Sequence, residues 1–184
     1  MNLNFPWHSY RISLFLETNG SDSNRKMDNQ LITDLKYSTD RFKLFALLCT
    51  KSEISDRISW LESENVPVLN IGKEIASFLD GLEDYRYLTI DVFDFLKKLL
   101  DSRACKIGES GNSVIAIYNL GILFEDQLEL NANNVLKEFS KISSVIIIWG
   151  NEFSYPDKLF WKDHQSNVSL YFSDAQLKIL KYAL

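Results

Sequence analysis

Histidine and cysteine are scarce in this sequence, which contains two of each. Cys49 and Cys105 lie far apart, so they form neither a disulfide framework nor a Cys-x-x-Cys metal pair. His8 and His164 have no cysteine or second histidine at the spacing that zinc sites use. The sequence therefore indicates no metal site, and two isolated thiols are typical of a protein kept in the reducing cytosol.

Long hydrophobic runs and excess positive charge are also lacking. No apolar run approaches the roughly 20 residues that cross a bilayer, and the N-terminus lacks the charged and then apolar order of a signal peptide. We therefore expect a cytoplasmic protein without a membrane contact. A net charge of −5 disfavours general binding to polyanions, so a nucleic-acid role would have to be local or come through a partner.

What is present is the composition of one folded domain. The 184 residues are 46% hydrophobic and include 12 Phe, 8 Tyr and 4 Trp, which is enough for a single buried core. Residues 10–16 alternate apolar and polar side chains and precede an Asn-Gly turn signal. We therefore predict an N-terminal strand and loop extension over residues 1–26 and an α/β domain over residues 27–184.

The main domain alternates apolar runs of strand length with segments of helical periodicity. Strands are expected at residues 42–49, 66–71, 114–118, 144–149 and 168–172. Helices are expected at residues 27–37, 52–64, 73–81, 89–102 and 131–141, and a last helix is expected to begin at Ser173 or Asp174. This alternation predicts a mostly parallel sheet with helices on both faces, whose functional groups collect at the carboxyl ends of the strands.

The turn after the first expected strand is where a P-loop protein wraps a glycine-rich loop around phosphates. Here the turn is Cys49-Thr50-Lys51-Ser52-Glu53, which contains no glycine. Thr50 and Glu53 match the capping box, in which side chains occupy the free N–H groups of a helix start. Glu53 also places a negative charge where a phosphate would bind. The pattern predicts a closed helix start; the alternative is that Lys51 and Ser52 are a working remnant of a nucleotide site.

The ends of the third and fourth expected strands are the other places to inspect, because an ATPase needs a carboxylate there to hold magnesium. The third strand ends in Tyr-Asn-Leu-Gly at residues 118–121, without a carboxylate, and Glu125 and Asp126 are expected to form a solvated turn. The fourth ends in a polar turn from Trp149 to Glu152, a candidate contact for a partner. No cofactor is therefore expected, and ATP with magnesium enters only if a remnant nucleotide site works.

An aromatic and basic segment further along offers a small patch for a partner or a nucleic acid. Phe160 and Trp161 stand between Lys158 and Lys162, which combines stacking surfaces with positive charge. Such a combination suits single-stranded nucleic acid. Packing of the aromatic rings in the core or against a partner explains the same residues.

Four short stretches follow one another in an order and spacing that a known family shares. They are Val-Leu-Asn-Ile at 68–71 with the helix after it, Asn-Leu-Gly-Ile-Leu-Phe at 119–124, Ile-Ile-Trp-Gly-Asn-Glu at 147–152, and Leu-Phe-Trp at 159–161 with His164 and Tyr171. In these stretches the chain, from about residue 27 to residue 171, resembles BrxF, a small P-loop protein of the BREX bacteriophage-exclusion systems. Together they cover most of the chain, although each motif is short.

The departures from that family lie at its nucleotide site. Tyr118 stands where the family has an acidic residue, Gly121 stands where a second acid is expected, and residues 50–53 replace the glycine-rich lysine loop. The resemblance implies a P-loop NTPase-like fold of the ASCE type, with the five expected strands in the order 5-1-4-3-2. It also implies a role in antiphage defence, but the family's ATP chemistry is not carried over.

Together these features favour a pseudo-ATPase that works as an adaptor or scaffold subunit of a prokaryotic antiphage defence complex. Its partners would be other proteins of that complex, in a hetero-oligomer. One alternative is an ATPase subunit with a nonstandard site that uses Lys51 and Ser52 or borrows catalytic residues from a partner. The other is a nucleic-acid-binding accessory subunit that uses the segment around Phe160 and Trp161.

Overall fold

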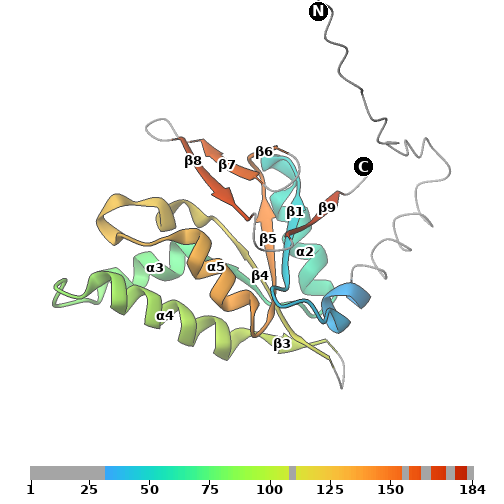
Figure 1. The fold of residues 1–184 in the computed structure, drawn as a ribbon, viewed down its shortest axis with the longest axis horizontal. Coiled ribbons are helices and arrows are strands. Elements are labelled where there is room, and N and C mark those ends of the chain that lie inside the picture. The colour runs from blue at the N-terminus through green and yellow to red at the C-terminus, as the bar shows by residue number, and fades with distance from the viewer. Residues whose placement is uncertain (1–31, 108–110, 155–157, 163–166, 173–176, 182–184) are drawn as a thin grey trace, which may run out of the picture.

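The computed structural model describes residues 32–107, 111–154, 158–162, 167–172 and 177–181 (Figure 1). The expected N-terminal strand at residues 10–16 and the boundary at residue 26 lie outside these residues, as do His8 and His164. Of the helix expected at 27–37, the described part, residues 32–37, is helical.

A mostly parallel sheet forms the centre of the fold (Figure 1). Its strands are β1 (Leu44–Leu48), β2 (Val68–Asn70), β4 (Ser113–Tyr118), β5 (Ser144–Trp149) and β9 (Leu177–Lys181), and the short β3 (Cys105–Lys106) pairs with β4. The order is β2-β4-β5-β1-β9, in which every neighbouring pair is parallel. The α/β class and the mostly parallel sheet predicted from the sequence are confirmed.

Four α-helices connect these strands in the described part of the chain. They are α2 (Ile54–Ser63), which follows the 3-10 turn η1 (Lys51–Glu53), α3 (Ile71–Asp80), α4 (Leu88–Arg103) and α5 (Ala132–Ser140). Two further 3-10 turns, η2 (Leu120–Phe124) and η3 (Asp126–Leu128), lead from β4 to α5. The helices expected between residues 52 and 141 are therefore confirmed with shifted ends, and no described helix has the length and apolarity that a bilayer crossing requires.

The two faces of the sheet bury alternate residues of each strand, as a pleated backbone requires. Leu44 and Ala46 of β1 belong to the core under α3, α4 and α5, which lie on one side of the sheet (Figure 1). Phe45 and Leu47 belong to the core on the other side, under α2 and Leu35 of the 32–37 helix. Because both faces are covered, every residue of β5 is buried, which explains its unbroken apolar sequence.

A second, antiparallel sheet stands at one end of the molecule and consists of β6 (Glu152–Ser154), β7 (Lys158–Lys162) and β8 (Asn167–Tyr171) (Figure 1). The expectation that residues 168–172 are the fifth strand of the main sheet is therefore wrong. Antiparallel strands need only short connections, whereas a parallel strand needs a crossover of a dozen or more residues. The short spacing between β6, β7 and β8 allows only the first arrangement.

The prediction of a helix that begins at Ser173 or Asp174 is also wrong for the described residues 177–181. These residues form β9, which pairs in parallel with β1 from Leu44↔Leu177 to Leu48↔Lys181. The run Leu-Lys-Ile-Leu-Lys has its two lysines three positions apart, so its pattern fits a helical turn as well as a strand. Its pairing covers the edge of β1, which would otherwise leave a row of backbone groups unpaired. Tertiary pairing therefore decides the conformation of this segment.

One residue of the expected helix at 89–102 lies elsewhere than its periodicity indicates. The register expected there places Ile90 on the apolar face with Phe93, Leu96 and Leu100, yet Ile90 is 60% exposed. The buried stripe of α4 consists of Val92, Leu96 and Leu100. Ile90 is therefore an apolar side chain on the surface.

Candidate functional site

The carboxyl ends of β1, β4 and β5 open onto a cavity of about 370 Å³, at the edge where parallel α/β sheets hold ligands. The residues that line it include Lys51 and Ile54 after β1, Tyr118 and Asn119 at the end of β4, Trp149, Gly150 and Asn151 at the end of β5, and Trp161 of β7. Three of the residues singled out from the sequence, Lys51, Trp149 and Trp161, thus come together at one place.

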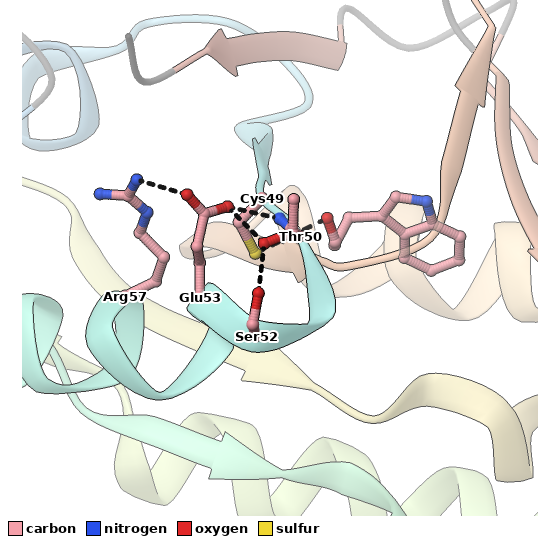
Figure 2. A network of polar contacts seen from close by, with 6 residues as sticks. Cys49, Thr50, Ser52, Glu53 and Arg57 are labelled. Carbon is pink, nitrogen blue, oxygen red and sulfur yellow. Dashed lines mark hydrogen bonds and ion pairs between the residues drawn. The ribbon is translucent and has the colours of Figure 1, made fainter. Parts of the chain in front are cut away.

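The turn between β1 and α2 is closed by its own side chains, as the capping pattern predicts (Figure 2). The Thr50 N–H donates a hydrogen bond of 2.6 Å to Glu53 Oε2, and the Thr50 hydroxyl donates one of 2.8 Å to the same oxygen. Ser52 Oγ lies 2.9 Å from Thr50 Oγ1. The capping box is therefore confirmed, and a carboxylate takes the N–H group that would face a phosphate in a nucleotide-binding turn.

The side chains of Glu53 and Arg57 are largely shielded from solvent. Glu53 Oε1 lies 3.9 Å from Arg57 Nη2, and the two side chains are 15% and 12% exposed, respectively. The hydrogen bond from the Thr50 backbone, then that from its hydroxyl, lowers the pKa of Glu53, and Arg57 adds a smaller effect in the same direction. Burial, followed by the Glu53 charge, raises the pKa of the Cys49 thiol. The thiol is therefore a poor nucleophile, because reactivity requires the thiolate.

The lowered pKa of Glu53 predicts how stability depends on pH. A carboxyl whose pKa in the folded protein is below its ordinary value of 4.5 stabilises the fold at pH values above 4.5. This contribution to the free energy of unfolding is lost as the pH falls through the pKa of the folded state. We expect Glu53→Gln to lower the free energy of unfolding at neutral pH and to differ less from wild type in acid. Urea denaturation at both pH values measures this, with Glu62→Gln on an exposed site of α2 as control. An equal difference at both pH values would contradict the assignment.

Two amide side chains join the ends of β2 and β4 beside the cavity. Asn119 Nδ2 donates a hydrogen bond of 2.9 Å to Asn70 Oδ1, which also accepts one of 3.0 Å from the Lys73 N–H at the start of α3. Asn119 has a left-handed backbone (φ 57°), which asparagine tolerates better than most residues. A Cβ on Gly72 would lie 2.5 Å from Asn119 Nδ2, so the close contact requires glycine. Neutral amides thus occupy the strand end where an ATPase needs a carboxylate.

Aromatic side chains form the wall of the cavity. Trp149 is buried, and its Nε1–H donates a hydrogen bond of 2.9 Å to the Glu152 carbonyl. Its ring meets that of Trp161 edge to face, with centroids 5.7 Å apart, and Trp161 also packs against Phe124 at 5.9 Å. A Cβ on Gly121 would lie 2.6 Å from Trp161 Cζ2. The Trp161 indole therefore anchors the small sheet to the main one.

The strand β7 divides its aromatic and basic residues between two faces. Residues alternate between the two faces of a strand, so Leu159 and Trp161 face the core while Lys158 and Phe160 lie on the other face. Lys158 is exposed, with its Nζ 5.4 Å from the centre of the Tyr171 ring. Trp161 therefore faces away from Lys158, whereas Phe160 shares the face of Lys158.

The other two candidates lie at the ends of this small sheet. Glu152 is exposed and pairs in register with Phe160 across β6 and β7, away from the cavity lining. Lys162 is the last residue of β7, paired with Asn167. The sequence argument missed Asn70 as a partner of Asn119, although an asparagine at the end of each of two parallel strands was a usable signal.

The described lining of the cavity is mostly uncharged. Lys51 is the one charged residue among the described residues that line it. Glu125 and Asp126 are exposed in the turn between η2 and η3, as expected, and no three described His, Cys, Asp or Glu residues lie close enough together to hold a metal ion. A scan against protein-family models, a search of the curated proteins and a search of the solved structures found no match to this chain.

Proposed function

We propose that this protein is a non-catalytic, P-loop-like subunit that serves as an adaptor or scaffold in a prokaryotic antiphage defence complex. The observation that carries the proposal is the closed turn after β1. There the Glu53 carboxylate accepts hydrogen bonds from the Thr50 N–H and hydroxyl at 2.6 and 2.8 Å. In a nucleotide-binding turn, backbone N–H groups and glycines are left free to wrap the phosphates.

The sheet supports the P-loop-like part of the proposal. Its run β2-β4-β5-β1 places the first four expected strands in the neighbour order 2-3-4-1, which the resemblance to BrxF implies for them. The place beside β1 is taken by β9 instead of the strand at 168–172. The strand order and the core are therefore compatible with the fold, although the last strand differs.

The ends of the other strands support the loss of catalysis. Asn119 and Asn70 hold each other at the ends of β4 and β2, and no carboxylate lines the described cavity. Without a carboxylate ligand, magnesium has no protein oxygen of the kind it prefers at this site. The setting, a defence complex, comes from the resemblance to BrxF, and in this setting the work is done by the surface of the protein.

Co-purification tests the proposal. We expect a tagged protein, expressed in a host with its whole native gene neighbourhood, to elute as a stoichiometric complex with other proteins when its mass is measured under nondenaturing conditions. Lys51→Ala is expected to leave the mass unchanged, because assembly does not depend on nucleotide. Elution of the wild-type protein alone as a monomer would count against the proposal.

The cavity favours one second candidate, a nucleotide-binding subunit with a nonstandard site. Lys51 is exposed beside an opening of about 370 Å³, and Ser52 lies on the same turn. Calorimetric titration with millimolar MgATP separates the two candidates. Saturable heat that disappears in Lys51→Ala would favour ATP and magnesium as ligands, whereas no saturable heat supports the non-catalytic subunit.

A further inference from the structure

Large apolar side chains are exposed together at the start of α4. Tyr85, Tyr87 and Ile90 are 58%, 63% and 60% exposed, which makes residues 85–90 the densest group of such side chains in the described structure. The Tyr85 hydroxyl donates a hydrogen bond of 3.3 Å to the Leu79 carbonyl, so this ring is held in place. Scattered exposed apolar residues are ordinary, but a cluster marks a contact surface.

Ile90 also lines a groove of about 270 Å³ between α4 and α5, two helices that lie side by side (Figure 1). Phe93, Leu130 and Val135 contribute the other apolar side chains of this groove. The Phe93 ring stacks on Phe139 of α5 with centroids 5.9 Å apart, which fixes the floor. We call the surface formed by Ile90, Phe93, Leu130 and Val135 the α4–α5 groove.

Both charged residues among the described lining of the groove are acidic. Glu129 and Glu138 line it, the first before α5 and the second near its end, and no Lys or Arg is among the described lining residues. Glu138 pairs with Lys141 but stays 53% exposed. Asp91 and Asp94 follow Ile90 along α4. An apolar strip with an acidic border is complementary to a partner segment that is apolar on one side and basic on the other.

We propose that the α4–α5 groove is the docking site for a short, basic amphipathic helix of a partner protein. The inference rests on the proposed adaptor function and gives that adaptor a partner of stated chemistry. Two neighbouring helices leave a groove that accepts the i, i+3, i+4 side chains of a third helix. A second copy of this chain, with its net charge of −5, fits the acidic border poorly.

A peptide pair tests the groove directly on the full chain. The probe is a fluorescently labelled Leu/Lys peptide of about 18 residues with apolar residues on one helical face, long enough to form a helix by itself. Its twin replaces every lysine with glutamate. We expect saturable binding of the Leu/Lys peptide in fluorescence anisotropy and none of the twin. Equal binding of both peptides, or no binding of either, would overturn the proposal.

Two matched variants locate the binding site. Ile90 and Ile142 are both 60% exposed, but Ile142 follows α5 and does not line the groove. We expect Ile90→Arg to weaken the affinity for the Leu/Lys peptide by about tenfold or more, and Ile142→Arg to change this affinity by less than about twofold. Both variants add the same charge, so the difference between them reports on the position of the residue. Circular dichroism checks that both variants fold. An equal loss in both variants would show a general charge effect and would refute the groove.

Other occupants give different results. Self-association in sedimentation that is abolished by Ile90→Arg would assign the groove to a second copy and overturn the proposal. If the co-purified complex forms equally well with Ile90→Arg, docking at the groove is wrong while the adaptor function stands. If the wild-type protein forms no complex, the adaptor function fails, and the groove is then judged by the peptide measurement alone.

Discussion

Replacing Trp149 with alanine is expected to lower the free energy of unfolding by about 3–5 kcal/mol. The side chain is among the largest fully buried ones in the described structure. It packs edge to face on Trp161 and donates a hydrogen bond to the Glu152 carbonyl. Alanine would leave a cavity at the end of β5 and an unpaired carbonyl, and both losses act at the junction of the two sheets.

Urea denaturation followed by circular dichroism measures this loss. Trp149→Phe keeps most of the ring volume but removes the N–H donor, so its loss is expected to be smaller, about 1–3 kcal/mol. Ile142→Ala, at an exposed site, is expected to change stability by less than about 0.5 kcal/mol. Since domains are stable by only about 5–15 kcal/mol, the effect of Trp149→Ala is large. A loss below about 1 kcal/mol would show that Trp149 does not join the two sheets as described.

Replacing Gly121 with alanine is expected to cost about 1–3 kcal/mol, because it overpacks the contact with Trp161. The added Cβ would lie 2.6 Å from Trp161 Cζ2 and 3.1 Å from Cε2. The indole cannot move away freely, since Trp149 and Phe124 pack against it with ring centroids 5.7 and 5.9 Å away. Either the turn after β4 or the Trp161 ring has to shift, which changes the wall of the cavity.

Gly81→Ala is the matched control for this change. A Cβ there would lie 3.6 Å from its nearest neighbour, the Phe78 carbonyl oxygen, and Gly81 has a right-handed backbone with φ −95°. The Gly81→Ala substitution is therefore expected to leave the free energy of unfolding unchanged or to raise it slightly. Tryptophan emission and urea denaturation compare the two variants. If Gly121→Ala is as stable as Gly81→Ala and its emission is unchanged, Trp161 is not wedged against the turn.

The sequence predicted those parts of the fold that local patterns determine. The buried strands β1, β4 and β5 have unbroken apolar sequences because helices cover both faces of the sheet. The capping box at Thr50 and Glu53 involves residues three positions apart, so the closed turn could be predicted from the sequence alone. Both features depend on near neighbours in the chain.

Features that depend on distant pairing could not be predicted in this way. The segment Leu177–Lys181 is a strand because β1 offers it an edge, more than a hundred residues earlier in the chain. Ile90 follows the helical period of α4 but is 60% exposed, at the rim of the groove between α4 and α5. The bond between Asn70 and Asn119 spans two strands and requires that Gly72 approach closely. Each of these outcomes is set by tertiary contacts.

The candidate site also has features that could be predicted from the sequence and features that could not. Lys51, Trp149 and Trp161 line one cavity because the carboxyl ends of parallel strands share an edge and β7 folds back over them. The patch predicted on β7 took Phe160 and Trp161 together, whereas a strand divides neighbours in sequence between its two faces. Once residues 158–162 are known to be a strand, Phe160 and Trp161 have to point in opposite directions.

The main sheet is held by its apolar core, and the turn at the end of β1 satisfies its own polar groups. The proposed α4–α5 groove lies on the α4 and α5 side of the sheet, while the closed turn leads into α2 on the other side. Substitutions at the groove and at the turn can therefore be tested separately.

The measurement that tests the central claim most directly is the mass, under nondenaturing conditions, of what co-purifies with the tagged protein from a host that carries its native gene neighbourhood. The account predicts a stoichiometric complex with other proteins, whose mass is the same for the wild type and for Lys51→Ala. Recovery of the protein alone as a monomer, or a complex that Lys51→Ala dissolves, would contradict it.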